Sequence, residues 1–241
     1  MEREEYNRDI NPYPSFGKKY NNEKAIISMT SWAARISTCS KTIFSLLKQC
    51  PGFHIVLVLS EEEFPKMMDE LPENLKLFVD NELVEVLWVY KNYRSFKKWI
   101  FTSQKYPNVP IISADDDCIY TCNYAQELYD EWIKNDKNAD ITMCLNKIYD
   151  FSVAWGFATL HNYIELKPII HVIINLLKQN NTHDDLLYAV ISHKLGRHII
   201  SLNKNLKNVA TLHDENAAIH ITYKNKRNTE YLKDIFNAFA K

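Results

Sequence analysis

Three consecutive aspartates follow a short apolar run, and they are the residues of this chain most suited to chemistry. The stretch Val109–Asp117 reads VPIISADDD and ends in Asp115, Asp116 and Asp117. Such a run predicts a buried strand, and burying three unpaired anions would be very costly. We therefore expect the acids at the C-terminal end of the strand, where open α/β sheets bind ligands. Clustered carboxylate oxygens suit a hard divalent cation, Mg²⁺ or Mn²⁺. A solvated acidic loop is the alternative.

A second pair of carboxylates lies at the predicted start of a helix. In NNTHDDLLYAVISHKLG, Thr182 and Asp185 fit a capping box, and Gly196 fits the C-terminal stop of the helix. Capping is a sufficient role for Asp185 but does not account for both acids, because a capping box uses one. Asp184, with His183 beside it, makes this cluster a second candidate site.

The elements that position these acids are predicted from hydrophobic runs and turn signals. We predict strands at the apolar runs 25–29, 54–59, 84–90, 109–114, 140–148 and 198–202. We predict helices at 40–49, after a Ser60–Glu63 capping box, at 95–104, at 123–134, from Pro168, from Thr182 and over 229–241. Alternating strands and helices indicate an α/β fold, with a mostly parallel sheet flanked by helices in a single domain.

Glycine is scarce, which limits how a nucleotide could be bound. The four glycines are too widely spaced for a GxGxxG fingerprint or a P-loop. Any nucleotide phosphates would have to be held mainly by a metal ion and by cationic side chains.

Composition limits the partners and the setting. Lys and Arg number 29 against 30 Asp and Glu, so no cationic surplus points to nucleic acid, and we expect no such partner. No apolar run approaches the roughly 20 residues of a membrane span, and the start MEREEYNRDI lacks the apolar core of a signal peptide. The five cysteines show no paired spacing, which favours a reduced, cytoplasmic setting.

The two ends of the chain differ from its middle. Residues 1–23 are polar with scattered aromatics and are predicted to form an irregular N-terminal arm. Residues 223–241 are predicted as a C-terminal amphipathic helix, preceded by basic residues and carrying Phe236 and Phe239. Such a segment suits peripheral contact with an anionic inner-membrane leaflet. A helix packed on the domain is the alternative.

Four stretches, in this order, carry a resemblance to a known family: SMTSWAARI, FPKMM with its following LP, YRSFKKWI and PIISADDD. They resemble small bacterial glycosyltransferases of GT-A type, similar to glycosyltransferase family 2, from capsule and lipopolysaccharide gene clusters. The resemblance implies a GT-A-like domain over 24–222, with a nucleotide-sugar half at about 24–122 and an acceptor half at about 123–222. The family's glycine-rich acceptor-side segment is replaced here by DFSVAWGFATL, whose one glycine is Gly156.

For the donor, the resemblance implies that Asp115 and Asp117 are the outer acids of a DXD motif. Asp117 would bind the metal that bridges the two donor phosphates, and Asp115 or Asp116 would contact ribose or metal. Lys98 would reach the donor, while Lys97 beside it is expected to be exposed, although the two could be exchanged. The remaining residues of the implied nucleotide pocket are Thr30, Ser31 and Arg35.

For the acceptor, the resemblance implies that Asp185 or Asp184 is the general base of an inverting enzyme, with Asp185 favoured. His213 resembles a late histidine that completes metal coordination in some GT-A enzymes. His183 and His220 are rival candidates for that role, and a solvated loop histidine is another interpretation.

The resemblance, with these residues, implies a metal-dependent, inverting glycosyltransferase that moves a sugar from a nucleotide-sugar donor to a saccharide or lipid-linked acceptor, in bacterial surface polysaccharide synthesis. A divalent cation and a lysine would stabilise the charge that develops on the departing diphosphate. A carboxylate would activate the acceptor hydroxyl, which is a poor nucleophile. The alternatives are a sugar nucleotidyltransferase and a non-catalytic sugar-binding module with the same fold.

Overall fold

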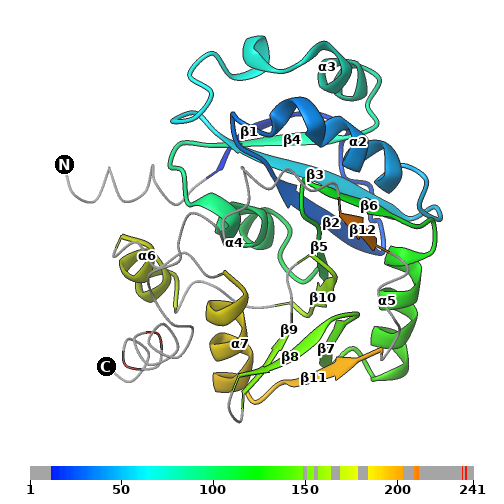
Figure 1. Ribbon diagram of the computed structural model, residues 1–241, viewed down its shortest axis with the longest axis vertical. Coiled ribbons are helices and arrows are strands. Elements are labelled where there is room, and N and C mark those ends of the chain that lie inside the picture. The colour runs from blue at the N-terminus through cyan, green and yellow to red at the C-terminus, as the bar shows by residue number, and fades with distance from the viewer. Residues whose placement is uncertain are drawn as a thin grey trace.

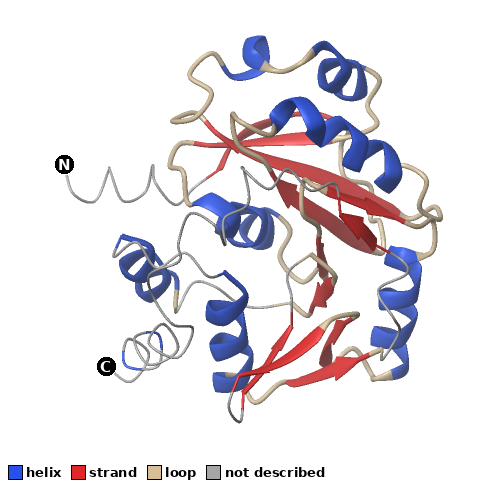
Figure 2. Ribbon diagram, viewed as in Figure 1, coloured by secondary structure: helices blue, strands red, loops and turns tan. Residues whose placement is uncertain are grey.

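The computed structural model describes residues 12–148, 151–154, 157–163, 169–178, 184–202, 209–211, 235 and 237. In these residues one large sheet has helices packed against both of its faces (Figures 1 and 2). This confirms the α/β class, the mostly parallel sheet and the flanking helices that the sequence predicts for a single domain.

The large sheet has eight strands in the order β1-β4-β3-β2-β5-β10-β7-β11. Their bounds are β1 Pro12–Gly17, β2 Ala25–Thr30, β3 Phe53–Ser60, β4 Glu85–Val89, β5 Ile111–Ser113, β7 Ala139–Thr142, β10 Thr159–His161 and β11 His198–Ser201. The four strands β4, β3, β2 and β5 run parallel, and β11 runs parallel to β7. Strand β10 is antiparallel to both β5 and β7. The carboxyl ends of four neighbouring strands therefore meet at one edge, which we call the carboxyl edge.

Two short pairs of strands complete the described β-structure. Strand β6 (Cys118–Tyr120) pairs antiparallel with β12 (Val209–Thr211), and β8 (Leu145–Ile148) pairs antiparallel with β9 (Phe151–Ala154). The first pair begins directly after the three aspartates. A segment from the end of the chain is thereby attached beside them.

Alternation along the strands builds a core on each face of the sheet. In β2, Ala25, Ile27 and Met29 belong to one buried cluster, whereas Ile26 belongs to the other. This follows from the strand period of two, which sends successive side chains to opposite faces. Strand β3 is buried at all eight positions, as expected for a strand covered on both sides.

Six α-helices of the described chain are divided between these faces. Their bounds are α2 Ile36–Leu46, α3 Glu73–Asp80, α4 Lys97–Lys105, α5 Tyr124–Lys134, α6 Ile170–Lys178 and α7 Asp184–Lys194. Short 3₁₀ turns cover Met67–Glu70 and Arg94–Phe96. Residues of α2, α3 and α5 pack into one cluster, and residues of α4, α6 and α7 pack into the other (Figure 1).

Most predicted elements are confirmed, with differences in their extents. The first helix begins at Ile36 rather than Ser40. The predicted strand 140–148 is two strands, β7 and β8. Most of the C-terminal helix 223–241 lies outside the described residues, but Ile235 is buried in the same cluster as α4 and α7. Among the described helices, none is long and apolar enough to cross a membrane.

The prediction of an irregular arm is wrong for residues 12–17, which form strand β1 against β4. The sequence PYPSFG hides this strand because its two prolines lack an N–H for a sheet ladder. Prolines are tolerated on an edge strand, and β1 is an edge strand. Gly17 ends it with a φ of +88°, and a Cβ there would lie 2.2 Å from the carbonyl oxygen of Val84.

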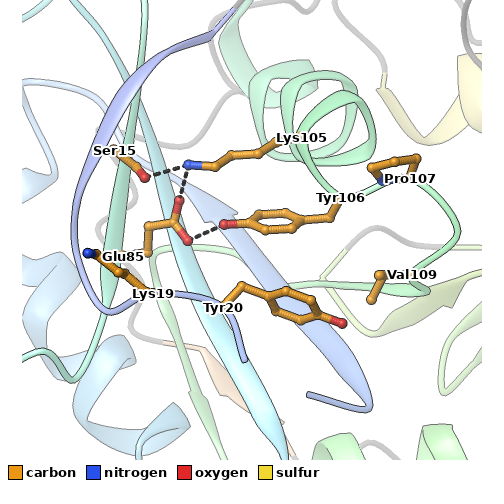
Figure 3. A pocket seen from close by; sticks show the side chains of 8 residues that line it. All are labelled: Ser15, Lys19, Tyr20, Glu85, Lys105, Tyr106, Pro107 and Val109. Carbon is orange, nitrogen blue, oxygen red and sulfur yellow. Dashed lines mark hydrogen bonds and ion pairs between the residues drawn. The ribbon is translucent and has the colours of Figure 1, made fainter. Parts of the chain in front are cut away.

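A buried ionic network lies at the opposite edge of the sheet, beside a cavity of about 450 Å³ (Figure 3). The Glu85 carboxylate is 1% exposed and accepts bonds from Lys105 at 2.6 Å and from Tyr106. His54 Nε2 lies 2.5 Å from the same carboxylate. Burial alone would raise the pKa of Glu85, but the bonds from His54, Lys105 and Tyr106 outweigh it and lower the pKa to about 2. Both carboxylate oxygens are thus engaged within the protein, and we assign this network a structural role.

Replacing Glu85 by Gln is expected to lower the free energy of unfolding by about 3 kcal/mol at neutral pH, because it removes the anion from a buried ionic network. The folded-state pKa of Glu85 is depressed. Its stabilisation is therefore present above the ordinary pKa of 4.5 and is lost as pH falls through about 2. Chemical denaturation across this range should show the difference between wild type and Glu85→Gln shrinking from pH 4.5 to 2. A difference that stays constant over this range would contradict the assignment.

Candidate functional site

The three aspartates lie at the carboxyl edge, as the sequence predicts. Strand β5 ends at Ser113, and the fully buried Ala114 leads into the acids. The loop after β2, which carries Ser31 and Arg35, meets them there. Its side chains bond to the acids directly, so the structure brings the predicted nucleotide-pocket loop and the acidic loop together.

The central acid, Asp116, is held inside the protein. It is 3% exposed and accepts a hydrogen bond from Ser31 Oγ at 2.6 Å, with Arg35 Nη2 3.2 Å from its other oxygen. Thr42 on α2 donates to its backbone carbonyl at 2.9 Å. Burial raises the pKa of Asp116 to about 6, although Arg35 and Ser31 act in the lowering direction. Asp116 therefore positions the loop more than it offers ligand oxygens to solvent.

The outer acids are the accessible ones. The side chain of Asp115 is 40% exposed, and that of Asp117 is 25% exposed. Each has one oxygen on a cation: Asp115 on Lys98 at 2.6 Å, and Asp117 on Arg35. Tyr120 fixes the loop further by accepting the backbone N–H of Asp115 at 2.9 Å. The two accessible carboxylates are thus the two that the DXD resemblance names as outer acids.

Lys98 joins the two predicted carboxylate sites. It lies on α4 and is 4% exposed, and its Nζ is 2.6 Å from Asp115 Oδ1 and 3.5 Å from Asp184 Oδ2. Burial would lower the pKa of Lys98, but the charges of Asp115, Asp184 and Asp185 outweigh it and raise the pKa above its ordinary value. The ammonium therefore stays charged and binds the first turn of α7 to the acidic loop.

Asp184 and Asp185 both lie in the first turn of α7, as predicted. Asp184 makes an ion pair with Lys98. The negative charge of Asp185 also helps to raise the pKa of Lys98. Thr182 and His183 lie outside the described residues. The structure thus places both candidate bases near the acids, and Asp184 forms an ion pair with Lys98.

Thr30 is turned away from this cluster. Its hydroxyl donates to the carbonyl of Val58 on β3 at 2.7 Å, a contact that ties the end of β2 to its neighbour. Of the four residues assigned to the nucleotide pocket, Ser31, Arg35 and Lys98 contact the acids, and Thr30 bonds to the sheet.

Lys97 is buried, so the expectation that it is exposed is wrong. It is 1% exposed, and its Nζ donates to Glu63 at 2.6 Å and to Asn92 at 3.0 Å.

The prediction that a Ser60–Glu63 capping box begins a helix is also wrong. Ser60 does bond to Glu63 at 3.0 Å, but residues 61–63 form a turn and no α-helix begins there. Glu63 instead balances the charge of the buried Lys97. The two residues are 34 positions apart, so no local sequence pattern predicts that they pair.

The donor atoms at this edge fit a hard cation in part. Asp115 and Asp117 offer carboxylate oxygens from one loop, which is the chemistry that Mg²⁺ and Mn²⁺ prefer. Within the described residues, no group of three or more His, Cys, Asp or Glu side chains is placed to hold a metal ion. His213 and its rivals His183 and His220 lie outside those residues. Thr211, two positions before His213 in sequence, pairs with Cys118 in β6, next to Asp117.

Comparisons with known proteins concern the fold. No protein-family model matches the chain, and no curated protein matches it in sequence. It is similar in structure to the glycosyltransferase GlyE of Streptococcus pneumoniae TIGR4, at 11% identity and a TM-score of 0.49, covering 90% of this chain and 64% of that one. The apo form of GlyE gives 12% identity and a TM-score of 0.46, with 92% and 65% covered. S. aureus TarS gives 11% identity and a TM-score of 0.50, with 89% and 43% covered.

The chain therefore spans less than two thirds of the length of each of these proteins. At such low identity, the likeness to TarS shows a shared fold and leaves activity, donor and acceptor to be argued from the site. That fold agrees with the GT-A-like α/β domain expected from the sequence.

Proposed function

We propose that this protein is a glycosyltransferase that transfers a sugar from a nucleotide-sugar donor to a hydroxyl of a saccharide or lipid-linked acceptor. The observation that carries the proposal is the position of Lys98 between Asp115 and Asp184 at the carboxyl edge. In a metal-dependent, inverting sugar transfer, one set of carboxylates holds the metal ion that binds the donor, and another carboxylate takes the proton of the acceptor hydroxyl. Two such groups, 69 positions apart in sequence, meet at one lysine.

On the donor side, Asp115 and Asp117 would hold a divalent cation, with His213 as a proposed third protein ligand. A bound Mn²⁺ or Mg²⁺ supplies positive charge that stabilises the departing diphosphate. Arg35 and Lys98 add fixed cationic groups at the same edge, which a chain without a glycine-rich phosphate loop requires. Ser31 and Asp116 keep Arg35 in place through their bonds in the loop.

On the acceptor side, Asp184 or Asp185 would take the proton of the attacking hydroxyl, which makes the reaction inverting. Asp184 pairs with Lys98 and its side chain is 24% exposed, so it is tested first, with Asp185 as the alternative base. The bacterial surface polysaccharide setting, and membrane contact through residues 223–241, rest on the sequence resemblance and on the basic tail.

Product analysis separates this proposal from its two rivals. The protein would be incubated with a panel of UDP- and GDP-sugars and Mn²⁺, and released nucleotide would be measured by ³¹P NMR. Free UDP or GDP supports a glycosyltransferase. Pyrophosphate formed from a nucleoside triphosphate and a sugar phosphate would support a nucleotidyltransferase instead. Binding with neither product would support a sugar-binding module.

Asp117→Asn is expected to weaken Mn²⁺-dependent binding of the nucleotide sugar at least about 10-fold, because it removes a proposed metal ligand. The fold should persist, since Arg35 retains Asp116 as a partner. Thermal shift with UDP- and GDP-sugars, with and without Mn²⁺, measures this because a bound ligand stabilises the native state. Asp80→Asn, which alters an exposed acid at the end of α3, is the matched control. An unchanged Mn²⁺ requirement in Asp117→Asn would refute the metal assignment.

Asp184→Asn is expected to slow nucleotide release from the donor by about 10²- to 10⁴-fold and to spare donor affinity, because a base acts on the acceptor proton rather than the diphosphate. Asp185→Asn, tested in parallel, decides between the two acids. If both acids only cap α7, Asn should cost about 1 kcal/mol or less of unfolding free energy and little activity. Wild-type rates in both variants would rule out the proposed base.

A further inference from the structure

Three polar side chains line one face of α7 and contact different parts of the domain. Asp184, Tyr188 and Ser192 are spaced by four residues, which places them one above another on the helix. Asp184 reaches Lys98, whereas Tyr188 and Ser192 both reach Asp140 on β7. The candidate base and two buried hydroxyls therefore share one stripe of the helix.

Asp140 is a carboxyl group at the centre of a buried hydrogen-bond network. It is 0% exposed and accepts hydrogen bonds from Tyr188 Oη at 2.8 Å, from the backbone N–H of Asn162 at 2.8 Å and from Ser192 Oγ. Burial raises the pKa of Asp140, while these donors and nearby Arg197 act to lower it. Burying a carboxylate is costly. Apolar contacts could hold a helix against a sheet without that cost. The bonds between Asp140 and α7 are therefore candidates for a role other than packing.

The Tyr188 ring extends the same network toward the site. It packs against His161 of β10 with ring centroids 3.8 Å apart, and against Trp99 of α4 at 5.2 Å. Trp99 follows Lys98 in sequence, and His161 Nε2 is 2.7 Å from the hydroxyl of Ser113, the last residue of β5. The Tyr188 ring thus touches α4, which carries Lys98, and β10, the strand that pairs with β5.

We propose that Asp140 is a positioning residue for sugar transfer: through the hydroxyls of Tyr188 and Ser192 it fixes α7, so that Asp184 stays against Lys98. This inference rests on the proposed function. The directional hydrogen bonds to Asp140 help to fix the rotation and the height of α7, in addition to the packing of its buried residues. The gap between Asp184 and Lys98 is already 3.5 Å, so a shift of about 1 Å would break the ion pair. Displacement on this scale can cost a catalytic group about 100-fold in rate.

A double-mutant cycle tests the positioning without any substrate. The unfolding equilibrium constants of wild type, Tyr188→Phe, Asp184→Asn and the double variant would be measured by chemical denaturation. If the Tyr188 hydroxyl holds Asp184 against Lys98, the two losses overlap, and the combined effect falls short of the product of the single effects by about 3-fold or more. The control cycle pairs Asp184→Asn with Tyr106→Phe, which removes a similar buried tyrosine–carboxylate bond at the far edge of the sheet. That cycle should be multiplicative.

Kinetics then distinguish positioning from simple stabilisation. With a donor that releases UDP or GDP, Tyr188→Phe and Asp140→Asn should lower kcat about 10-fold and leave the KM for the donor unchanged, whereas Tyr106→Phe should change neither. A multiplicative cycle for Tyr188 and Asp184, or a wild-type kcat in folded Tyr188→Phe, would overturn the inference. If wild-type protein releases no nucleotide from any donor tested, the proposed function fails separately, and the cycle alone decides whether Asp140 positions Asp184.

Discussion

The buried ammonium of Lys98 is the group on which the arrangement of the site depends. A lysine that is 4% exposed keeps its charge only if anions replace the water that it has lost, and here the anions come from two distant segments. Asp115 follows a strand of the parallel half of the sheet, and Asp184 opens a helix on the antiparallel side. One cation therefore links the half that would bind a nucleotide to the half that would bind an acceptor. The negative charges that keep the lysine charged thus come from both halves.

The sheet explains why these groups meet where they do. Four parallel strands end at one edge, and β10, running the opposite way, begins there because Thr159 pairs with Ser113. The loops that follow the strands at this edge provide room for a cluster of polar side chains. The opposite edge carries another network of charged side chains around Glu85, but there both carboxylate oxygens are already bonded within the protein. Charged side chains thus form a structural network at one edge and include accessible acids at the other.

Sequence patterns predict the parts of this structure that depend on local order. The strands β2, β3 and β4 are mostly apolar runs, and the acids that follow β5 mark the carboxyl edge. The pairs that organise the site are different, because they join residues far apart in the chain. Glu63 and Lys97 are separated by 34 positions, and Asp140 and Tyr188 by 48. Neither pair produces a periodic pattern in the sequence. Asp140, although buried, cannot be told in the sequence from an exposed acid at the end of a strand. Strand β1 escaped prediction for a related reason, since its prolines suit only an edge position that the fold itself creates.

Three identical aspartates in a row illustrate how much the fold adds to composition. Asp116 is enclosed by Ser31, Arg35 and Thr42, and burial raises its pKa to about 6. Its neighbours are more accessible: the side chain of Asp115 is 40% exposed and that of Asp117 is 25% exposed. Of the outer two acids, Asp115 pairs with Lys98 and Asp117 pairs with Arg35. The central acid thereby becomes the anchor that holds Arg35 in the loop. A motif that appears as three equivalent acids in sequence divides in the structure into one internal support and two more accessible carboxylates.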